Sequence, residues 1–149
     1  MFWSEGAPNR HKSENSCRDA LLSLLSARLE PLGVDCQPEF DYVNDKRADI
    51  RVSYPNQYVL PIEIKGEWHP KLWTAIQGQL VVQYTAPRET TGYGVYLVLW
   101  AGGTEQPAPK DGGKRAKTAE ELASRLQAFV APELQKLIKV RTLDIRWPS

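Results

Sequence analysis

Three strand-type segments follow one another in the first half of the chain, and the turns between them are too short to hold a helix. Residues 47–54 alternate cleanly between apolar and polar side chains, residues 58–66 are mostly apolar, and residues 34–43 alternate less regularly. Strands joined by short turns pair antiparallel, whereas parallel pairing needs a long crossover. The sequence therefore predicts a three-stranded meander, against which the remaining segments have to pack.

Helical patterns precede and follow this meander. One runs from Ser13, a suitable N-cap, to Pro31, with apolar residues at three- and four-residue intervals. Another spans residues 70–84 and starts with a proline, which suits a first helical turn. A third begins at a capping box formed by Thr118 and Glu121.

Two further strand patterns complete the chain. Residues 92–100 form an apolar run typical of a strand buried on both faces, and residues 140–147 alternate as a last strand. The order α-β-β-β-α-β-α-β predicts an α/β fold with a central mixed β-sheet flanked by helices. We expect residues 1–12 to form a flexible lead-in and residues 13–149 a single domain, with residues 101–117 as a mobile basic loop.

The composition is that of a globular protein without a membrane segment. Hydrophobic residues make up 42% and charged residues 25% of the 149 positions. No apolar run approaches the ~20 residues that cross a bilayer, and the N-terminal residues lack the apolar stretch of a secretory signal. Cys17 and Cys36 form neither a disulfide framework nor a metal-binding spacing, which favours a cytoplasmic protein. The net charge of +1 excludes a global polycation but leaves room for local basic patches.

Glu63 and Lys65 interrupt the otherwise apolar third strand segment. They lie two residues apart and so point to the same face of the strand. If this strand pairs with the preceding one through a turn at residues 55–57, Asp49 falls roughly opposite Glu63. Two such carboxylates repel unless a cation lies between them, and Mg²⁺ or Mn²⁺ bound by Asp49, Glu63 and the Ile64 carbonyl would suit. With Lys65 beside a metal-bound water and a phosphate, these are the parts that phosphodiester hydrolysis requires.

Asp49 followed by Glu63-Ile64-Lys65, on the second and third strands after a helix, resembles the motif of the PD-(D/E)XK nuclease superfamily. The predicted order α-β-β-β-α-β is similar to its restriction-endonuclease-like core and covers about residues 13–100. The resemblance implies that Asp49 and Glu63 bind the metal and that Lys65 is the catalytic lysine. It also implies DNA as the substrate, cleaved to leave a 5′-phosphate.

The resemblance extends to two helices. Many members carry an acidic residue on the first helix that completes the site, and Glu14 matches it. In the RecB-like branch a glutamine and a tyrosine lie on the helix after the lysine strand, for which Gln79 and Tyr84 are the matches. Their spacing is one residue longer than usual, which leaves Gln83 as an alternative on that face. Ala48 stands where the family commonly has a proline.

Basic residues around these positions are expected to contact DNA phosphates. Some flank the predicted site and others lie in the basic loop. The sequence leaves open whether the chain acts as a homodimer or is fused to a targeting module. The predicted nucleic-acid-binding residues are Arg47, Arg51, Lys71, Tyr84, Lys114 and Arg115.

Structural explanations compete with these functional ones. Asp49, Glu63 and Lys65 could instead form an exposed cross-strand salt bridge, which contributes under ~1 kcal/mol. Glu14 could be a first-turn acid favoured by the helix dipole, and His69 is more readily a loop or cap residue than a general base. The favoured function is a nuclease in phage defence, restriction, mobile-element processing or repair. The alternative is a catalytically inactive nuclease-fold module that binds nucleic acid or a protein.

Overall fold

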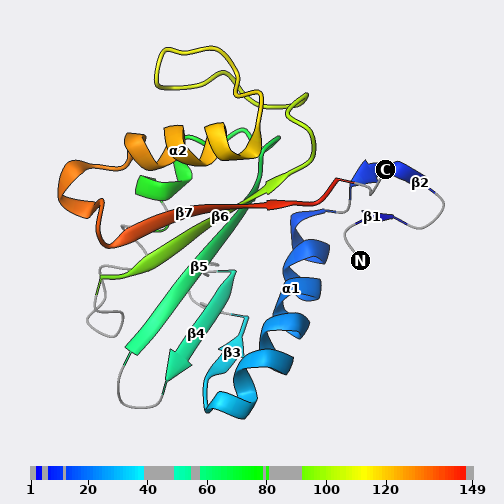
Figure 1. Ribbon diagram of the computed structural model, residues 1–149, viewed down its shortest axis with the longest axis vertical. Coiled ribbons are helices and arrows are strands. Elements are labelled where there is room, and N and C mark those ends of the chain that lie inside the picture. The colour runs from blue at the N-terminus through cyan, green and yellow to red at the C-terminus, as the bar shows by residue number, and fades with distance from the viewer. Residues whose placement is uncertain are drawn as a thin grey trace.

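The computed structural model describes residues 3–4, 7–11, 13–38, 49–54, 58–78, 80 and 92–146, the first two ranges as backbone only. Its centre is a five-stranded sheet in the order β3-β4-β5-β6-β7 (Figure 1). β3, β4 and β5 pair antiparallel, whereas β5, β6 and β7 pair parallel. The predicted α/β class with a central mixed sheet is therefore confirmed. The strands are β3 (Asp35–Gln37), β4 (Ile50–Tyr54), β5 (Tyr58–Gly66), β6 (Gly94–Trp100) and β7 (Ile138–Asp144).

The register between β4 and β5 is the one that the short turn predicts. Tyr54 pairs with Tyr58 next to the turn, and Ile50 pairs with Ile62 at the far end. The ladder ends there, and Asp49 lies one residue before β4, beside the end of the ladder where Glu63 follows Ile62. The local turn length thus determines which charged residues meet.

The first helix begins and ends where the sequence predicts. Ser13 caps α1 (Glu14–Leu29), and its Oγ accepts the Ser16 N–H at 3.3 Å. A short 3₁₀ turn, η1 (Glu30–Leu32), follows the helix. Gly33 then takes a left-handed φ of 79°, a conformation that favours glycine and redirects the chain toward β3.

The last helix, α2 (Ala119–Phe129), starts at the predicted capping box. Thr118 Oγ1 accepts the Glu121 N–H at 3.1 Å, and Glu121 Oε2 accepts the N–H of Lys117, one residue before the cap, at 2.8 Å. A 3₁₀ turn, η4 (Pro132–Leu134), then leads into β7.

Two hydrophobic clusters cover the two faces of the sheet, because successive side chains of a strand point to opposite sides. The two helices lie against different faces (Figure 1). The cluster that includes α1 takes Val95, Leu97 and Leu99 from β6, whereas the cluster that includes α2 takes Tyr96, Val98 and Trp100.

The N-terminal segment departs from the predicted flexible lead-in. β1 (Trp3–Ser4) and β2 (Ala7–His11) form a separate two-stranded antiparallel sheet in which Trp3 pairs with His11. The sequence here lacks the apolar alternation of a strand and contains Pro8, so it gave no sign of this pairing.

The helix predicted over residues 70–84 is replaced by turns at its start. Residues 70–74 form turns, and a helical hydrogen bond first appears between the Ala75 N–H and the Lys71 carbonyl, at 2.8 Å. The adjacent residues Leu72 and Trp73 are both buried, so this segment is covered on more than one side. Such burial overrides the single apolar stripe of a surface helix. Residues 79 and 81–84 lie outside the described part of the chain.

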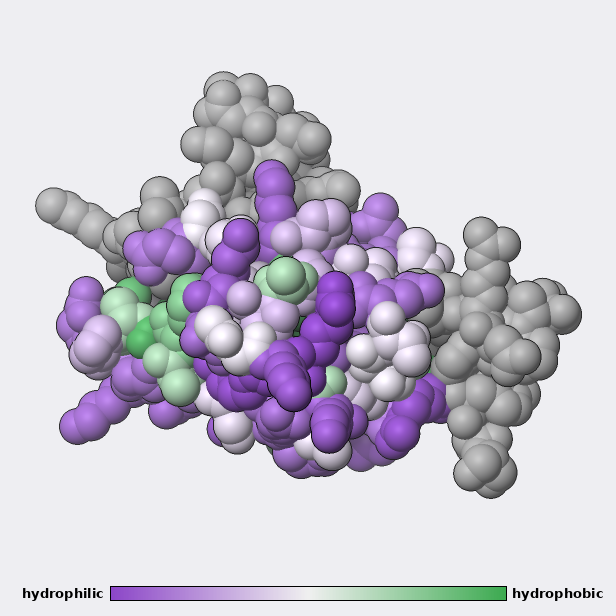
Figure 2. All heavy atoms as spheres, turned by 90° about the horizontal axis from the view of Figure 1, so that it is seen from above, coloured by the Kyte–Doolittle hydropathy of each residue, from purple (hydrophilic) through white to green (hydrophobic). Residues whose placement is uncertain are grey.

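None of the helices in the described ranges is long and apolar enough to cross a membrane. Figure 2 shows the molecule from above, where α2 and the loop before it cover the surface, and this face is mostly hydrophilic. A smaller hydrophobic area lies to one side of the same view.

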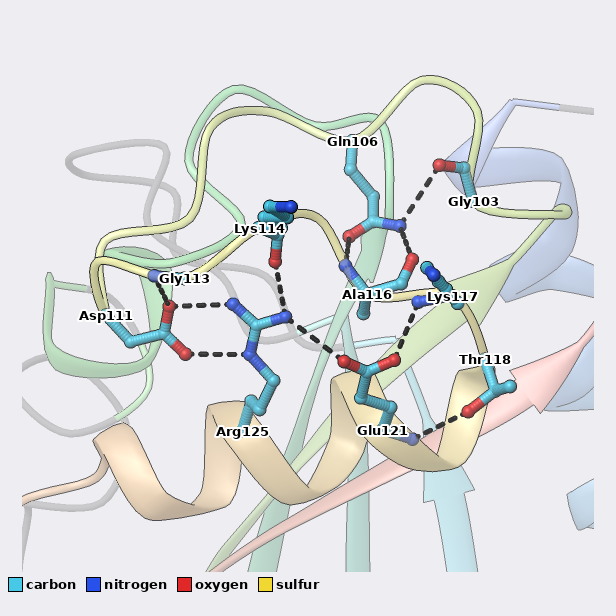
Figure 3. A network of polar contacts seen from close by, with 10 residues as sticks. All are labelled: Gly103, Gln106, Asp111, Gly113, Lys114, Ala116, Lys117, Thr118, Glu121 and Arg125. Carbon is cyan, nitrogen blue, oxygen red and sulfur yellow. Dashed lines mark hydrogen bonds and ion pairs between the residues drawn. The ribbon is translucent and has the colours of Figure 1, made fainter.

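The basic loop at residues 101–117 is irregular, as predicted, but its backbone is tied to α2 and to itself (Figure 3). Arg125 of α2 holds the Asp111 carboxylate through two hydrogen bonds of 2.8 Å. The Gln106 carboxamide donates to the Ala116 carbonyl at 2.8 Å and accepts the Ala116 N–H at 3.2 Å. These contacts involve both halves of the loop, and its mobility stays a prediction.

Candidate active site

Glu63 and Lys65 lie on β5, the central strand of the sheet, between β4 and β6. Lys65 Nζ and Glu63 Oε1 are 2.8 Å apart and form an ion pair. Only 2% of Glu63 and 8% of Lys65 is exposed. The alternative of a solvent-exposed salt bridge is therefore wrong. Burying this pair costs desolvation energy that its mutual attraction offsets only in part, so the stability of the fold gives no reason for its presence.

Asp49 directly precedes β4 and faces the strand that carries this ion pair. The Ile64 N–H donates to Asp49 Oδ2 at 2.7 Å, which fixes the carboxylate against β5. Among the causes that raise the pKa of Glu63, repulsion from Asp49 ranks directly after burial. The two carboxylates therefore repel each other, in keeping with the register of β4 and β5.

Glu14 reaches the same strand from the first turn of α1. Its Oε1 accepts the Gly66 N–H at 2.7 Å, immediately after Lys65. Cys17, one helical turn later, is buried, so this face of α1 is turned toward the sheet as predicted. The fold thus brings an acid from 52 residues away to the end of β5.

The environment of the site raises the pKa of both strand carboxyls. Burial raises the pKa of Glu63 from 4.5 to about 7, with repulsion from Asp49 as the second cause and the Lys65 ammonium acting against both. Burial also raises the pKa of Asp49, opposed by the hydrogen bond from Ile64 and by Lys65. Carboxyl groups perturbed in this way are concentrated at functional sites, although structural ion pairs show the same effect.

One feature of the acidic side chains suits the binding of a hard divalent cation, and another does not. Glu63 Oε2 is buried and accepts no hydrogen bond from the described residues, which leaves a carboxylate oxygen able to bind a cation. Within the same residues, no three His, Cys, Asp or Glu side chains are grouped to hold a metal ion, and Glu14 instead bonds to Gly66. Mg²⁺ commonly keeps several waters and needs only one or two carboxylates, which Asp49 and Glu63 supply.

Tyr96 lies beside the site and was not predicted from sequence. It pairs with Glu63 across β5 and β6, is fully buried, and its O–H donates to the Leu72 carbonyl at 2.7 Å. This bond ties the turns after β5 to the sheet. The only sign in the sequence was a polar hydroxyl within an otherwise apolar strand.

Arg18 and His69 interact electrostatically with the acidic residues of the site. Arg18 follows Glu14 by four residues on α1, and its charge lowers the pKa of Asp49. Burial lowers the pKa of His69, while the charge of Glu14 raises it. His69 Nδ1 accepts the Lys71 N–H at 3.0 Å, which matches the alternative that His69 caps a turn. A basic residue four positions after a candidate acid was the available signal for Arg18.

The predicted nucleic-acid-binding residues are only partly described. Arg51 is half-buried on β4, and Lys71 is exposed in the turns after β5. Lys114 and Arg115 are exposed in the loop, where Arg115 Nε donates to the Gln106 carbonyl at 2.6 Å. Arg115 therefore supports the loop backbone through one of its nitrogens. Arg47, Gln79 and Tyr84 lie outside the described residues.

The raised pKa of Glu63 predicts a pH-dependent stability for the metal-free protein. Because the folded pKa of about 7 lies above the usual 4.5, Glu63 contributes most below pH 4.5, and this contribution is lost as the pH rises to about 7. Glu63→Gln cannot ionise, so it removes this pH dependence, and we expect its stability relative to wild type to rise as the pH goes from 4 to 8. Urea unfolding of both proteins at the two pH values measures this change. A stability difference that stays constant or falls between pH 4 and pH 8 would contradict the prediction.

Comparison with known proteins gives one match. The family described as a domain of unknown function, DUF8371, matches residues 1–103, so the chain belongs to this family. The match includes the helix and strands that carry Glu14, Asp49, Glu63 and Lys65, and it ends shortly after β6. No curated protein and no solved structure shows significant similarity to the chain.

Proposed function

We propose that this member of the DUF8371 family is a metal-dependent nuclease that hydrolyses phosphodiester bonds in DNA. One observation carries the proposal: a buried Glu63–Lys65 ion pair beside Asp49, in which Glu63 Oε2 accepts no hydrogen bond from the described residues. Burying two carboxylates and an ammonium costs free energy that a purely structural role does not explain. A divalent cation and a phosphate would offset that cost.

The proposed site divides the chemistry among residues of β5 and its neighbours. Asp49 and Glu63 would hold Mg²⁺ or Mn²⁺, which when bound polarises a water molecule and the scissile phosphate. The Ile64 N–H keeps the Asp49 carboxylate in place. The Lys65 ammonium, next to Glu63, would orient the attacking water and stabilise the negative charge that develops on the phosphate oxygens.

The same proposal assigns the fold to the restriction-endonuclease-like class. The order α1-β3-β4-β5-β6, with an antiparallel meander followed by a parallel strand, supports it. So does the meeting of an α1 acid with the end of the lysine-bearing strand. Both cysteines are free, buried thiols, which suits a cytoplasmic enzyme.

The experiment incubates the purified protein with plasmid, linear duplex and single-stranded DNA, with Mg²⁺, with Mn²⁺ and with EDTA. We expect cleavage only when metal is present, with products that carry 5′-phosphates. Asp49→Asn should lose both Mn²⁺ binding and cleavage. No cleavage of any substrate with either metal would contradict the proposal. DNA binding without metal binding would instead support a non-catalytic module.

A further inference from the structure

The outer edge of β7 is closed by a side chain. β7 is a terminal strand of the five-stranded sheet, paired on one side with β6. The Leu137 carbonyl accepts the Gly94 N–H at the start of this pairing. Because backbone groups alternate sides along a strand, the polar groups of Ile138 and Val140 point away from β6. An exposed row of such groups is a template for pairing with another strand.

The side chain of Gln127, on α2, forms hydrogen bonds with these outward-facing backbone groups. Its Nε2 donates to the Ile138 carbonyl at 2.9 Å, and its Oε1 accepts the Val140 N–H at 2.8 Å. One carboxamide thus makes the two hydrogen bonds that a residue of a parallel neighbouring strand would make. Arg141 Nη1 donates to the next outward acceptor, the Val140 carbonyl, at 2.9 Å.

A second glutamine holds Gln127 in this position. Gln135 Oε1 accepts a hydrogen bond from Gln127 Nε2 at 3.1 Å, and Gln135 Nε2 donates to the Gln127 carbonyl at 2.7 Å. Gln135 therefore holds both the carboxamide and the backbone carbonyl of Gln127. The Gln127 side chain loses little further conformational freedom when it bonds to β7. Both glutamines follow the region of the chain that matches the family.

The space beside this edge is an open groove rather than a packed interior. An open groove of about 630 Å³ lies between α2 and β7, lined by Gln127, Ser124 and Thr142 among others. The opposite edge of the sheet is different, because β3 has only three residues and offers little length for pairing. β7, with seven residues, is the edge that requires protection.

We propose that Gln127 closes the β7 edge against antiparallel pairing with a second copy of this chain. Two β7 edges can pair around a twofold axis, since the same groups are presented by both copies. A register centred on Thr142 pairs Val140 with Asp144 and places Arg141 opposite Leu143. This register avoids direct contact between like charges. This register needs the Val140 N–H, which Gln127 occupies, and the Val140 carbonyl, to which Arg141 donates. If the pairing extends by one more pair, it also needs the Ile138 carbonyl, which Gln127 occupies as well.

The test replaces Gln127 with methionine, which has similar length and cannot make either hydrogen bond. Thr142→Cys, added to both proteins, reports the pairing as a disulfide-linked dimer under mild oxidation. We expect the crosslink in Gln127→Met and not in the protein that retains Gln127. In dilute Gln127→Met, where pairing is absent, amide exchange of Val140 should be at least about tenfold faster than in wild type.

Two further variants complete the experiment. Ser124→Ala changes the same groove without removing either bond to β7 and should behave as wild type. Gln127→Glu keeps the acceptor for Val140 and loses the donor to Ile138, so it should crosslink to an intermediate extent even if Gln127→Met fails to fold. Crosslinking with Gln127 present would overturn the inference. So would the absence of crosslinking in a folded Gln127→Met or Gln127→Glu protein.

Discussion

Replacing Lys65 with methionine is expected to lower the rate constant of the chemical step of DNA cleavage by about 10³-fold or more. The change keeps the aliphatic stem in its buried position and removes only the ammonium that lies 2.8 Å from Glu63. Removing one preorganised charge-stabilising group from an active site typically has an effect of this size. Single-turnover cleavage of a saturating DNA substrate in Mg²⁺ measures the loss in the chemical step.

The matched control for this variant is Lys139→Met on β7. Lys139 is exposed, and its Nζ donates to the Gln135 carbonyl. β6 separates β7 from β5, which carries Lys65. Its replacement should leave cleavage within about twofold of wild type, because surface substitutions away from such a site have small effects. Glu63→Gln should lose activity as Lys65→Met does. Retained cleavage in either site variant would rule out the assigned roles.

Replacing Glu67 with leucine is expected to destabilise the fold by about 3–5 kcal/mol. Glu67 follows β5 and is buried, with 1% exposed. Its Oε1 accepts the Ala101 N–H at 2.6 Å and the Gly103 N–H at 2.9 Å, so it joins the end of β5 to the chain that leaves β6. Leucine would leave both part-buried amides without this acceptor. The midpoint of urea unfolding measures the change.

Two variants show whether the acceptor oxygen is the cause. Glu67→Gln retains an oxygen at the same position and should lose only about 1 kcal/mol, since neutral hydrogen bonds are weaker than charged ones. Glu133→Leu, an exposed position in η4, should change stability by less than about 0.5 kcal/mol. A Glu67→Leu protein as stable as Glu67→Gln would show that the two amides find other partners.

Sequence reasoning succeeded where the determining interactions are local. The Ser13 cap of α1 and the Thr118–Glu121 cap of α2 depend on residues a few positions apart, and the structure contains both. The helix expected at residues 70–84 was wrong at its start, because Leu72 and Trp73 are buried side by side by parts of the chain distant in sequence. The spacing of apolar residues in a sequence indicates one buried face of a helix. It gives no sign that a segment is covered on several sides.

The sequence by itself determined that Asp49 and Glu63 face each other. A short turn sets the register of β4 and β5, and strand alternation sets the face on which each side chain lies. Only the tertiary structure decided that Glu63 and Lys65 are buried, that Glu14 reaches Gly66, and that Gln127 closes the edge of β7. These features depend on which distant segments exclude water from a side chain or supply its hydrogen-bond partner, and no local pattern in the sequence records that.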